Sequence, residues 1–137
     1  MVVTVIACIV VALAALLHVY IFWMESFGWR RPAVWRRFNV ADQAQADSNR
    51  ELAYNQGFYN LFLAIGAAIG VVLLASGAPS SGLRSAGLAL VFLSTGSMLA
   101  ASLVLLTLGR RFAAAALTQG LAPLIGLVLT AIVAATA

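Results

Sequence analysis

Four long stretches of apolar residues, separated by shorter polar segments, dominate the sequence. They cover roughly residues 2–27, 54–76, 83–108 and 112–135. Each reaches the ~20 residues that a helix needs to cross about 30 Å of hydrocarbon. Backbone groups in a bilayer have no water to bond, so each segment must satisfy its own hydrogen bonds as a helix or pair as a strand in a closed barrel. Barrel strands alternate polar and apolar residues with a period of two, and no stretch here does so. The pattern therefore predicts helices. We therefore predict one domain over residues 1–137, an all-α four-helix transmembrane bundle.

The composition agrees with a membrane location. Hydrophobic residues make up 64% of the chain and charged residues 9%, and the mean hydropathy is +1.04. A soluble domain of this size could not hide so much apolar surface. The net charge of +4 comes from eight arginines, with no lysine, that lie at or between the apolar stretches. This placement favours a topology signal over a nucleic-acid site, so the predicted partner is the lipid bilayer.

The arginines also predict the orientation of the bundle. The first loop holds five of them and the third loop two, whereas only Arg84 adjoins the second connection, residues 77–82. Those in the first and third loops are Arg30, Arg31, Arg36, Arg37, Arg50, Arg110 and Arg111. Cationic loops stay in the cytoplasm, so we predict an up-down-up-down bundle with both termini outside, in a bacterial cytoplasmic (inner) membrane.

The first loop, residues 28–53, is the only sizeable polar segment. Residues 32–38 mix arginines with aromatic residues, which is typical of a short helix lying on an anionic leaflet. Trp23, Trp29 and Trp35 are expected in the headgroup zone. Ser48 and Glu51 have the spacing of a capping box, which predicts that the second helix begins near Ser48.

Small residues four apart predict close contacts between helices. Gly66 and Gly70 form one such pair, and Gly96 and Ala100 form another. Such pairs let helix backbones approach closely. They could serve packing within the bundle or between protomers of a homo-oligomer, and we favour packing within the bundle.

Polar side chains inside the apolar stretches concentrate in the predicted cytoplasmic half. His18 and Glu25 are seven residues apart, so they share one helix face and differ by about 10 Å in height. Residues 55–60 of the second helix bring two polar pairs at i,i+4 spacing. Because polar groups are costly in a membrane, we predict a polar cavity that binds a ligand. Its predicted lining is His18, Glu25, Asn55, Gln56, Tyr59, Asn60 and Gln119.

Structural explanations compete with this site. Glu25 could reach the interface or pair with Arg30 or Arg31, and His18 could bond a backbone carbonyl or Asn60. Residues 55–60 could merely bind the loop to the bundle. The only cysteine, Cys8, permits no intrachain disulfide and is expected to be a small core residue. One histidine and one carboxylate about 10 Å apart cannot share a metal ion, so no metal site is predicted, and no cofactor motif is present.

Two motifs carry a resemblance to a known family. His18, Glu25 and Trp29 form the pattern H-x6-E-x3-W, and residues 55–60 read N-Q-G-F-Y-N. Over essentially the whole chain, the sequence resembles a group of small bacterial four-helix membrane proteins described only as a domain of unknown function. The similar family pattern includes a glutamine in the last helix, which Gln119 matches. The resemblance implies the fold and the membrane location but no activity.

Three functions remain open. The first is binding or transport of a small amphipathic or lipid-like molecule in the polar cavity, which we favour because no recognisable nucleophile or metal set is present. The second is a membrane enzyme that uses Glu25 and His18 as an acid/base pair on a lipophilic substrate. The third is an assembly partner in a larger membrane complex, held by its glycine faces and basic loop.

Overall fold

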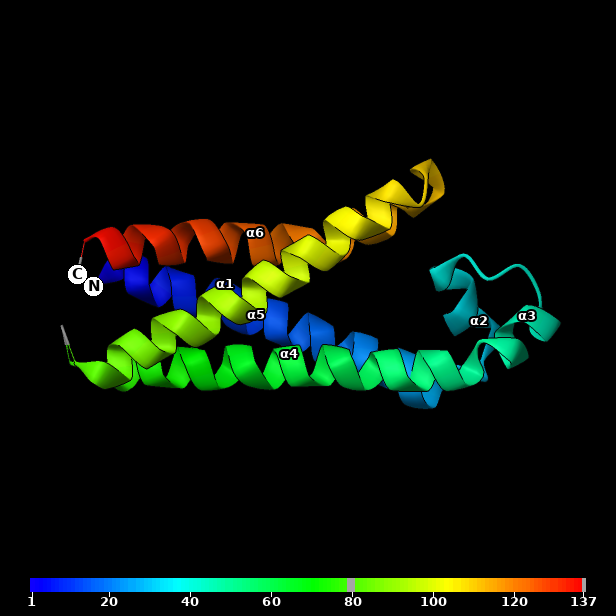
Figure 1. Cartoon of the computed structure of the whole chain (residues 1–137), viewed down its shortest axis with the longest axis horizontal. Helices are drawn as coiled ribbons and strands as arrows, with labels where there is room; N and C mark the ends of the chain where they lie inside the picture. Colours follow the sequence, from blue (N-terminus) through cyan, green and yellow to red (C-terminus); the bar gives the residue numbers. More distant parts are fainter. Residues whose placement is uncertain (79–80, 137) are drawn as a thin grey trace.

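The computed structural model describes residues 1–78 and 81–136, and its regular elements are helices (Figure 1). The four long α-helices are α1 (Val2–Trp23), α4 (Arg50–Ser76), α5 (Gly82–Thr107) and α6 (Ala113–Ala135). A π-helical turn, η1 (Met24–Gly28), continues α1, and a 3-10 turn, η3 (Arg110–Phe112), precedes α6. The all-α four-helix bundle predicted from the sequence is confirmed.

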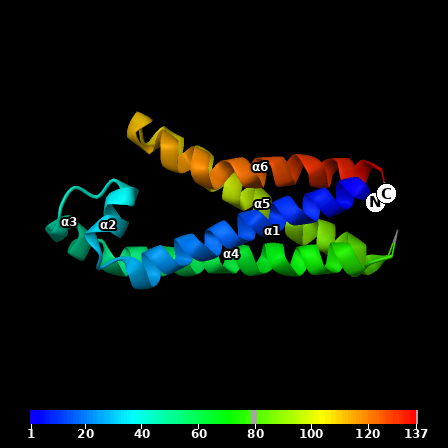
Figure 2. The ribbon, with the colours of Figure 1, turned by 180° about the vertical axis from the view of Figure 1, so that it is seen from behind.

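The helices alternate in direction, and both termini lie at one end of the bundle (Figures 1 and 2). α1 packs along α4 and α6, and α5 packs along the same two helices, so the four form a ring in the order α1, α4, α5, α6. We call the end with both termini the terminal end and the opposite one the loop end. The predicted connection over residues 77–82 joins α4 to α5 at the terminal end, and Pro79 and Ser80 within it lie outside the described residues.

Each long helix can cross a membrane. The candidate spans are Val2–Gly28, Arg50–Ser76, Gly82–Thr107 and Arg110–Ala135, each 26 or 27 residues long. At 1.5 Å per residue they measure roughly 40 Å, more than the hydrocarbon core requires. Large apolar side chains such as Leu16, Leu93 and Leu117 point outward and are about two-thirds exposed. A bilayer is the solvent that accommodates such a surface, and the chain is a multi-pass membrane protein.

The core between the helices is built from small side chains. Its central cluster comprises Val11, Ala14, Ala15, Ala64, Ala67, Val91 and Met98, with Ala122 packed against it. Gly70 lies directly on α5, since a Cβ atom there would be 2.9 Å from the backbone nitrogen of Val91. Gly66 similarly faces Ser94. Both glycines therefore serve packing within the bundle, as predicted, because their lack of a side chain lets the two backbones approach.

The second pair of small residues, Gly96 and Ala100, does not contact another described helix in this way. A Cβ atom at Gly96 would meet no atom within 4 Å among the described residues, and Ala100 is exposed. The expectation that this pair packs inside the bundle is therefore wrong. The reason is its position on α5: Gly96 lies on a face that no other described helix covers.

The first loop folds into a compact cap with its own core. It contains α2 (Pro32–Trp35), a 3-10 turn η2 (Arg36–Phe38) and α3 (Gln43–Ser48), which confirms a helical segment near residues 32–38. Trp29 and Trp35 pack with Ala46 and Ala53, and the Trp29 indole nitrogen donates to the Ala46 carbonyl at 2.9 Å. Of the three tryptophans, only Trp23 is exposed. Trp29 and Trp35 hold the loop together instead of facing lipid headgroups.

The start of α4 differs from the predicted capping box. α4 begins at Arg50, and Ser48 is the last residue of α3, so its hydroxyl does not cap the following helix. The capping instead occurs at the start of α3, where the Asp42 carboxylate accepts from the backbone nitrogen of Gln45 at 2.8 Å. The Gln45 side chain in turn accepts from the backbone nitrogen of Ala41 at 2.9 Å. These reciprocal bonds fix the start of α3.

The two glycines Gly70 and Gly96 offer a matched test of the packing. We expect Gly70→Leu to lower the free energy of unfolding by about 1–3 kcal/mol, because its side chain must push α5 away. Gly96→Leu should not lower it, because a Cβ atom there meets no described residue and leucine favours the helix more than glycine does. Both variants gain the same helix propensity. The difference between their free energies of unfolding, measured by reversible unfolding in mixed micelles, therefore isolates the steric clash at position 70. Equal stabilities of the two variants would contradict the packing.

Candidate functional site

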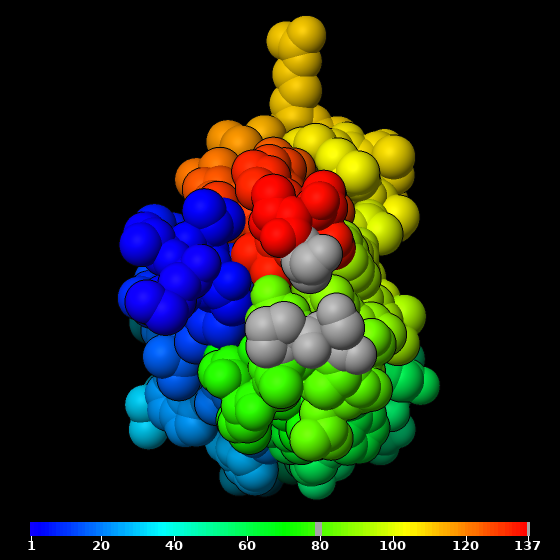
Figure 3. All heavy atoms as spheres, turned by 90° about the vertical axis from the view of Figure 1, so that its left-hand side faces the viewer, coloured from blue at the N-terminus to red at the C-terminus, as the bar shows by residue number. Residues whose placement is uncertain are grey.

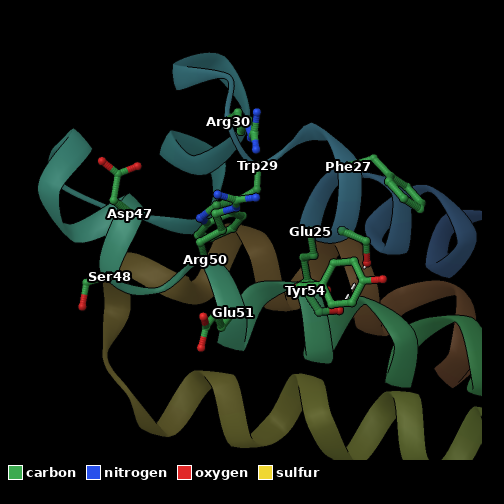
Figure 4. A pocket seen from close by; sticks show the side chains of 10 residues that line it. Glu25, Phe27, Trp29, Arg30, Asp47, Ser48, Arg50, Glu51 and Tyr54 are labelled. Atoms are coloured by element: carbon green, nitrogen blue, oxygen red, sulfur yellow. Dashed lines mark hydrogen bonds between the residues drawn. The ribbon is translucent and has the colours of Figure 1, made fainter.

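A cavity of about 560 Å³ opens at the loop end of the bundle (Figure 4). Three segments form its walls: η1 with the residues just after it, the end of α3, and the first turns of α4. The lining side chains are Glu25, Ser26, Phe27, Trp29, Arg30, Asp47, Ser48, Arg50, Glu51 and Tyr54. The cavity therefore lies where α1 and α4 leave their apolar spans and the cap begins.

The π-helical turn η1 brings α1 against α4 at this point. A π turn adds a residue to the helical turn and is frequent at functional sites. Gly57 makes the approach possible, because a Cβ atom there would collide with the Ser26 hydroxyl and lie 3.1 Å from the Phe22 carbonyl oxygen. The Ser26 hydroxyl donates to the Tyr54 carbonyl oxygen at 3.3 Å. The wall that carries Glu25 is thus fixed by backbone contact.

Charges of both signs line this cavity: three carboxylates and two guanidinium groups. In the described part of the chain, two arginine side chains donate hydrogen bonds: Arg37 to the Tyr20 hydroxyl and Arg84 to the Leu74 carbonyl oxygen. The cavity arginines, Arg30 and Arg50, thus form no hydrogen bond with its carboxylates within the described residues. Two of the carboxylates already accept a hydrogen bond through one oxygen atom each, Glu25 from Asn60 and Asp47 from Gln43. Their other oxygen atoms and the two arginines remain open to a bound molecule.

Glu25 is held by α4 and not by the neighbouring arginines. Its carboxylate accepts from the Asn60 side-chain nitrogen at 2.8 Å, and the same nitrogen lies 3.2 Å from the Gln56 carbonyl oxygen. Arg31 instead stacks over the ring of Trp23, at 5.6 Å from its centroid. The structure therefore does not contain the alternative pairing of Glu25 with Arg30 or Arg31. A charge-assisted bond to an amide secures this partly buried carboxylate.

His18 is buried in the bundle, with 2% of its surface exposed. Its Nδ1 atom lies 2.9 Å from the Ala14 carbonyl oxygen. A carbonyl oxygen only accepts hydrogen bonds, so Nδ1 carries the hydrogen, and in the neutral ring Nε2 is then an acceptor. His18 does not line the cavity that contains Glu25. The interpretation of His18 as a histidine satisfied by its own helix fits this geometry.

A layer of polar residues separates the apolar core from the loop end. Three members of the central cluster and Ala122, which packs against it, lie on four different helices. About one turn nearer the loop end, each of these helices carries a polar side chain. This polar layer consists of His18 (after Ala14), Asn60 (before Ala64), Ser102 (after Met98) and Gln119 (before Ala122). Ser102 is buried and packs on Gly120, while Asn60 and Gln119 are partly buried. Asn60 connects the layer to the cavity through Glu25.

The structure does not gather the seven predicted ligand-binding residues around one cavity. Glu25 lines the cavity, Asn60 bonds to Glu25, and His18 and Gln119 belong to the polar layer. Asn55, Gln56 and Tyr59 lie on the exposed surface of α4. The reason is the helical geometry: residues 55, 56 and 59 face away from η1, and only the face with Gly57 and Asn60 meets it.

Most of the cavity wall comes from residues that sequence reasoning did not select. Arg30 and Arg50 were assigned to the topology signal, Glu51 to helix capping and Trp29 to the headgroup zone, whereas Asp47 was given no role. The sequence did contain a sign of this, because these residues flank the two helix ends that the first loop connects. Their common location follows only once the cap is known to fold back on itself.

The bond between Glu25 and Asn60 can be measured by a double-mutant cycle. We expect Glu25→Ala and Asn60→Ala to be coupled by about 1–3 kcal/mol in the free energy of unfolding, the range for a hydrogen bond to a charged group. Asn55→Ala is the matched control, since Asn55 lies exposed on the same helix. Its coupling to Glu25→Ala should be near zero. A cycle in which both asparagines couple equally would show that the bond does not hold the site.

Comparison with known proteins places the chain in a family. No curated protein and no solved structure matches it. A family model matches residues 12–131, a stretch that includes both sequence motifs, the π turn, the cap and most of each long helix. This match confirms the resemblance noted from His18, Glu25 and residues 55–60. The chain belongs to the family described as "Protein of unknown function (DUF1304)".

Proposed function

We propose that this membrane protein binds a small amphipathic, lipid-like molecule whose polar head occupies the loop-end cavity. The observation that carries the proposal is the position of this cavity: a space of about 560 Å³ with open charges, at the boundary of the apolar spans. Four of its five charged side chains, those of Arg30, Asp47, Arg50 and Glu51, are exposed and therefore accessible to a head group. A head with complementary charge would satisfy them.

The lining supports a zwitterionic head. Arg30 and Arg50 offer forked donors suited to a phosphate, while Glu25, Asp47 and Glu51 are acceptors suited to an ammonium group. A purely anionic or purely cationic head would meet repulsion from one of the two sets. We therefore favour a head that carries one phosphate and one amine.

An aromatic path supports a long apolar tail. Phe27 and Tyr54 belong to the cavity wall and are about half exposed or more. Phe27 contacts Phe22, which contacts Phe58, with ring centroids 5.4 and 5.1 Å apart. Tyr54 also reaches Phe58, at 5.1 Å. This path leads from the cavity along the partly exposed side chains of α1 and α4, where an acyl chain would lie.

In this proposal the other predicted ligand-binding residues surround the cavity. His18, Asn60 and Gln119 would form the polar floor beneath the head, and Asn55, Gln56 and Tyr59 would contact the part of the molecule outside the cavity. In the predicted orientation the head would lie in the cytoplasmic leaflet of a bacterial inner membrane. We prefer a binding function over an acid/base enzyme, because His18 does not line the cavity that contains Glu25.

The proposal is tested with lysophosphatidylethanolamine, a single-chain lipid with a zwitterionic head. We expect the protein, purified in a neutral detergent, to bind it about tenfold more tightly than a monoacylglycerol of equal chain length. Glu25→Gln and Arg50→Gln should each remove most of this preference. Tryptophan fluorescence or native mass spectrometry reports the affinity.

Arg36→Gln is the matched control, because Arg36 is an exposed arginine of the cap outside the cavity. This variant should bind the lysolipid like the unaltered protein. If Glu25→Gln and Arg50→Gln also bind like the unaltered protein, the head does not occupy this cavity and the proposed function is wrong.

A further inference from the structure

A second cavity, of about 700 Å³, lies at the terminal end, far from the loop-end cavity (Figure 3 faces this end). Its lining comes from the starts of α1 and α5 and the ends of α4 and α6. The residues are Met1, Thr4, Val5, Cys8, Ile9, Leu74, Ala75, Gly77, Arg84 and Thr136. Arg84 is the one charged side chain in this otherwise apolar and weakly polar set.

The guanidinium group of Arg84 is poorly satisfied within the described residues. Its Nε atom is buried and has no hydrogen-bond partner among them. One terminal nitrogen, Nη1, donates to the Leu74 carbonyl oxygen at the long distance of 3.5 Å. A guanidinium carries five N–H donors, so most of its capacity is unused by this part of the chain. Arg84 as a whole is partly exposed, but leaving its buried Nε donor unbonded is unfavourable.

The acidic side chains of the chain cannot neutralise Arg84. The sequence contains four acidic residues, and they lie at positions 25, 42, 47 and 51, on the opposite end of the bundle. Arg84 is also the third residue of α5, whose N-terminal end carries a partial positive charge that disfavours a cation. Ser81 caps this helix, accepting from the Arg84 backbone nitrogen at 3.2 Å. Side chain and helix end therefore both attract an anion from outside.

The structure assigns this cavity to an anionic amphiphile, with its phosphate or carboxylate head on Arg84 and its alkyl chain along the exposed side chains of Val5 and Ile9. The guanidinium supplies a fork for two oxygen atoms, and the Thr4 hydroxyl in the same lining is a further donor. The apolar wall distinguishes an amphiphile from a free phosphate ion, which would gain nothing from it. This site shares no residue with the loop-end cavity, so it stands or falls independently of the proposed function.

Cys8 provides a reporter inside the cavity. It is the only cysteine of the chain, it is partly exposed, and it lines the same space as Arg84. A bound molecule should shield its thiol from a small neutral reagent such as methyl methanethiosulfonate. The rate of modification of the full chain in neutral detergent, followed by mass spectrometry, therefore measures occupancy at this site.

The experiment compares lysophosphatidylglycerol, a monoacylglycerol of equal chain length and inorganic phosphate. We expect the anionic lysolipid to slow Cys8 modification by about tenfold, the usual scale for a charge-assisted contact. The neutral lipid and phosphate alone should leave the rate unchanged. Arg84→Gln should abolish the protection, Arg84→Lys should keep part of it, and Arg110→Gln, at the loop end, should behave like the unaltered protein.

Three results would overturn the assignment. Equal protection by the neutral lipid would show a merely apolar pocket, and equal protection by inorganic phosphate would show a site for a small anion. Undiminished protection in Arg84→Gln would remove the role of the guanidinium. Should that variant fail to fold, the comparison of the three compounds on the unaltered protein still decides the question.

Discussion

The contact between the π turn η1 and Gly57 of α4 determines the arrangement of the loop end. Because Gly57 has no side chain, the backbone of α1 lies close enough for Glu25 to reach Asn60. That bond gives a carboxylate at the edge of an apolar span the partner it needs. The cap follows η1 along the chain, and the end of α3 and the start of α4 line the cavity together with η1. The loop-end cavity is the space that this geometry leaves.

The two ends of the bundle have different chemistry, although the middle is uniform. Small residues fill the centre and let four helices approach, which leaves little room there for a ligand. At the loop end, carboxylates and guanidinium groups share one cavity with aromatic side chains. At the terminal end, Arg84 is the only charged side chain of an apolar cavity. The two ends of the bundle thus present different polar groups at the boundaries of the apolar spans.

Sequence reasoning predicted the four helices, their alternation and the role of Gly66 and Gly70, because membrane thickness and small-residue spacing act locally. It could not predict that Gly96 faces outward, since spacing does not reveal which helix face is covered. The candidate site was predicted only in part: Glu25 and Asn60 do meet, whereas Tyr59 is exposed. Helical periodicity relates residues within one helix, but the cavity wall depends on how the cap folds, which long-range contacts decide.

The most direct test of the account is photo-crosslinking with a lysophosphatidylethanolamine that carries a diazirine on the acyl carbon next to its glycerol. The head in the loop-end cavity would place this carbon beside Phe27 and Tyr54. The account predicts crosslinks in the peptides that contain these residues, and their loss in Glu25→Gln. Crosslinks spread over the outward faces of α5 and α6, unchanged by Glu25→Gln, would contradict it.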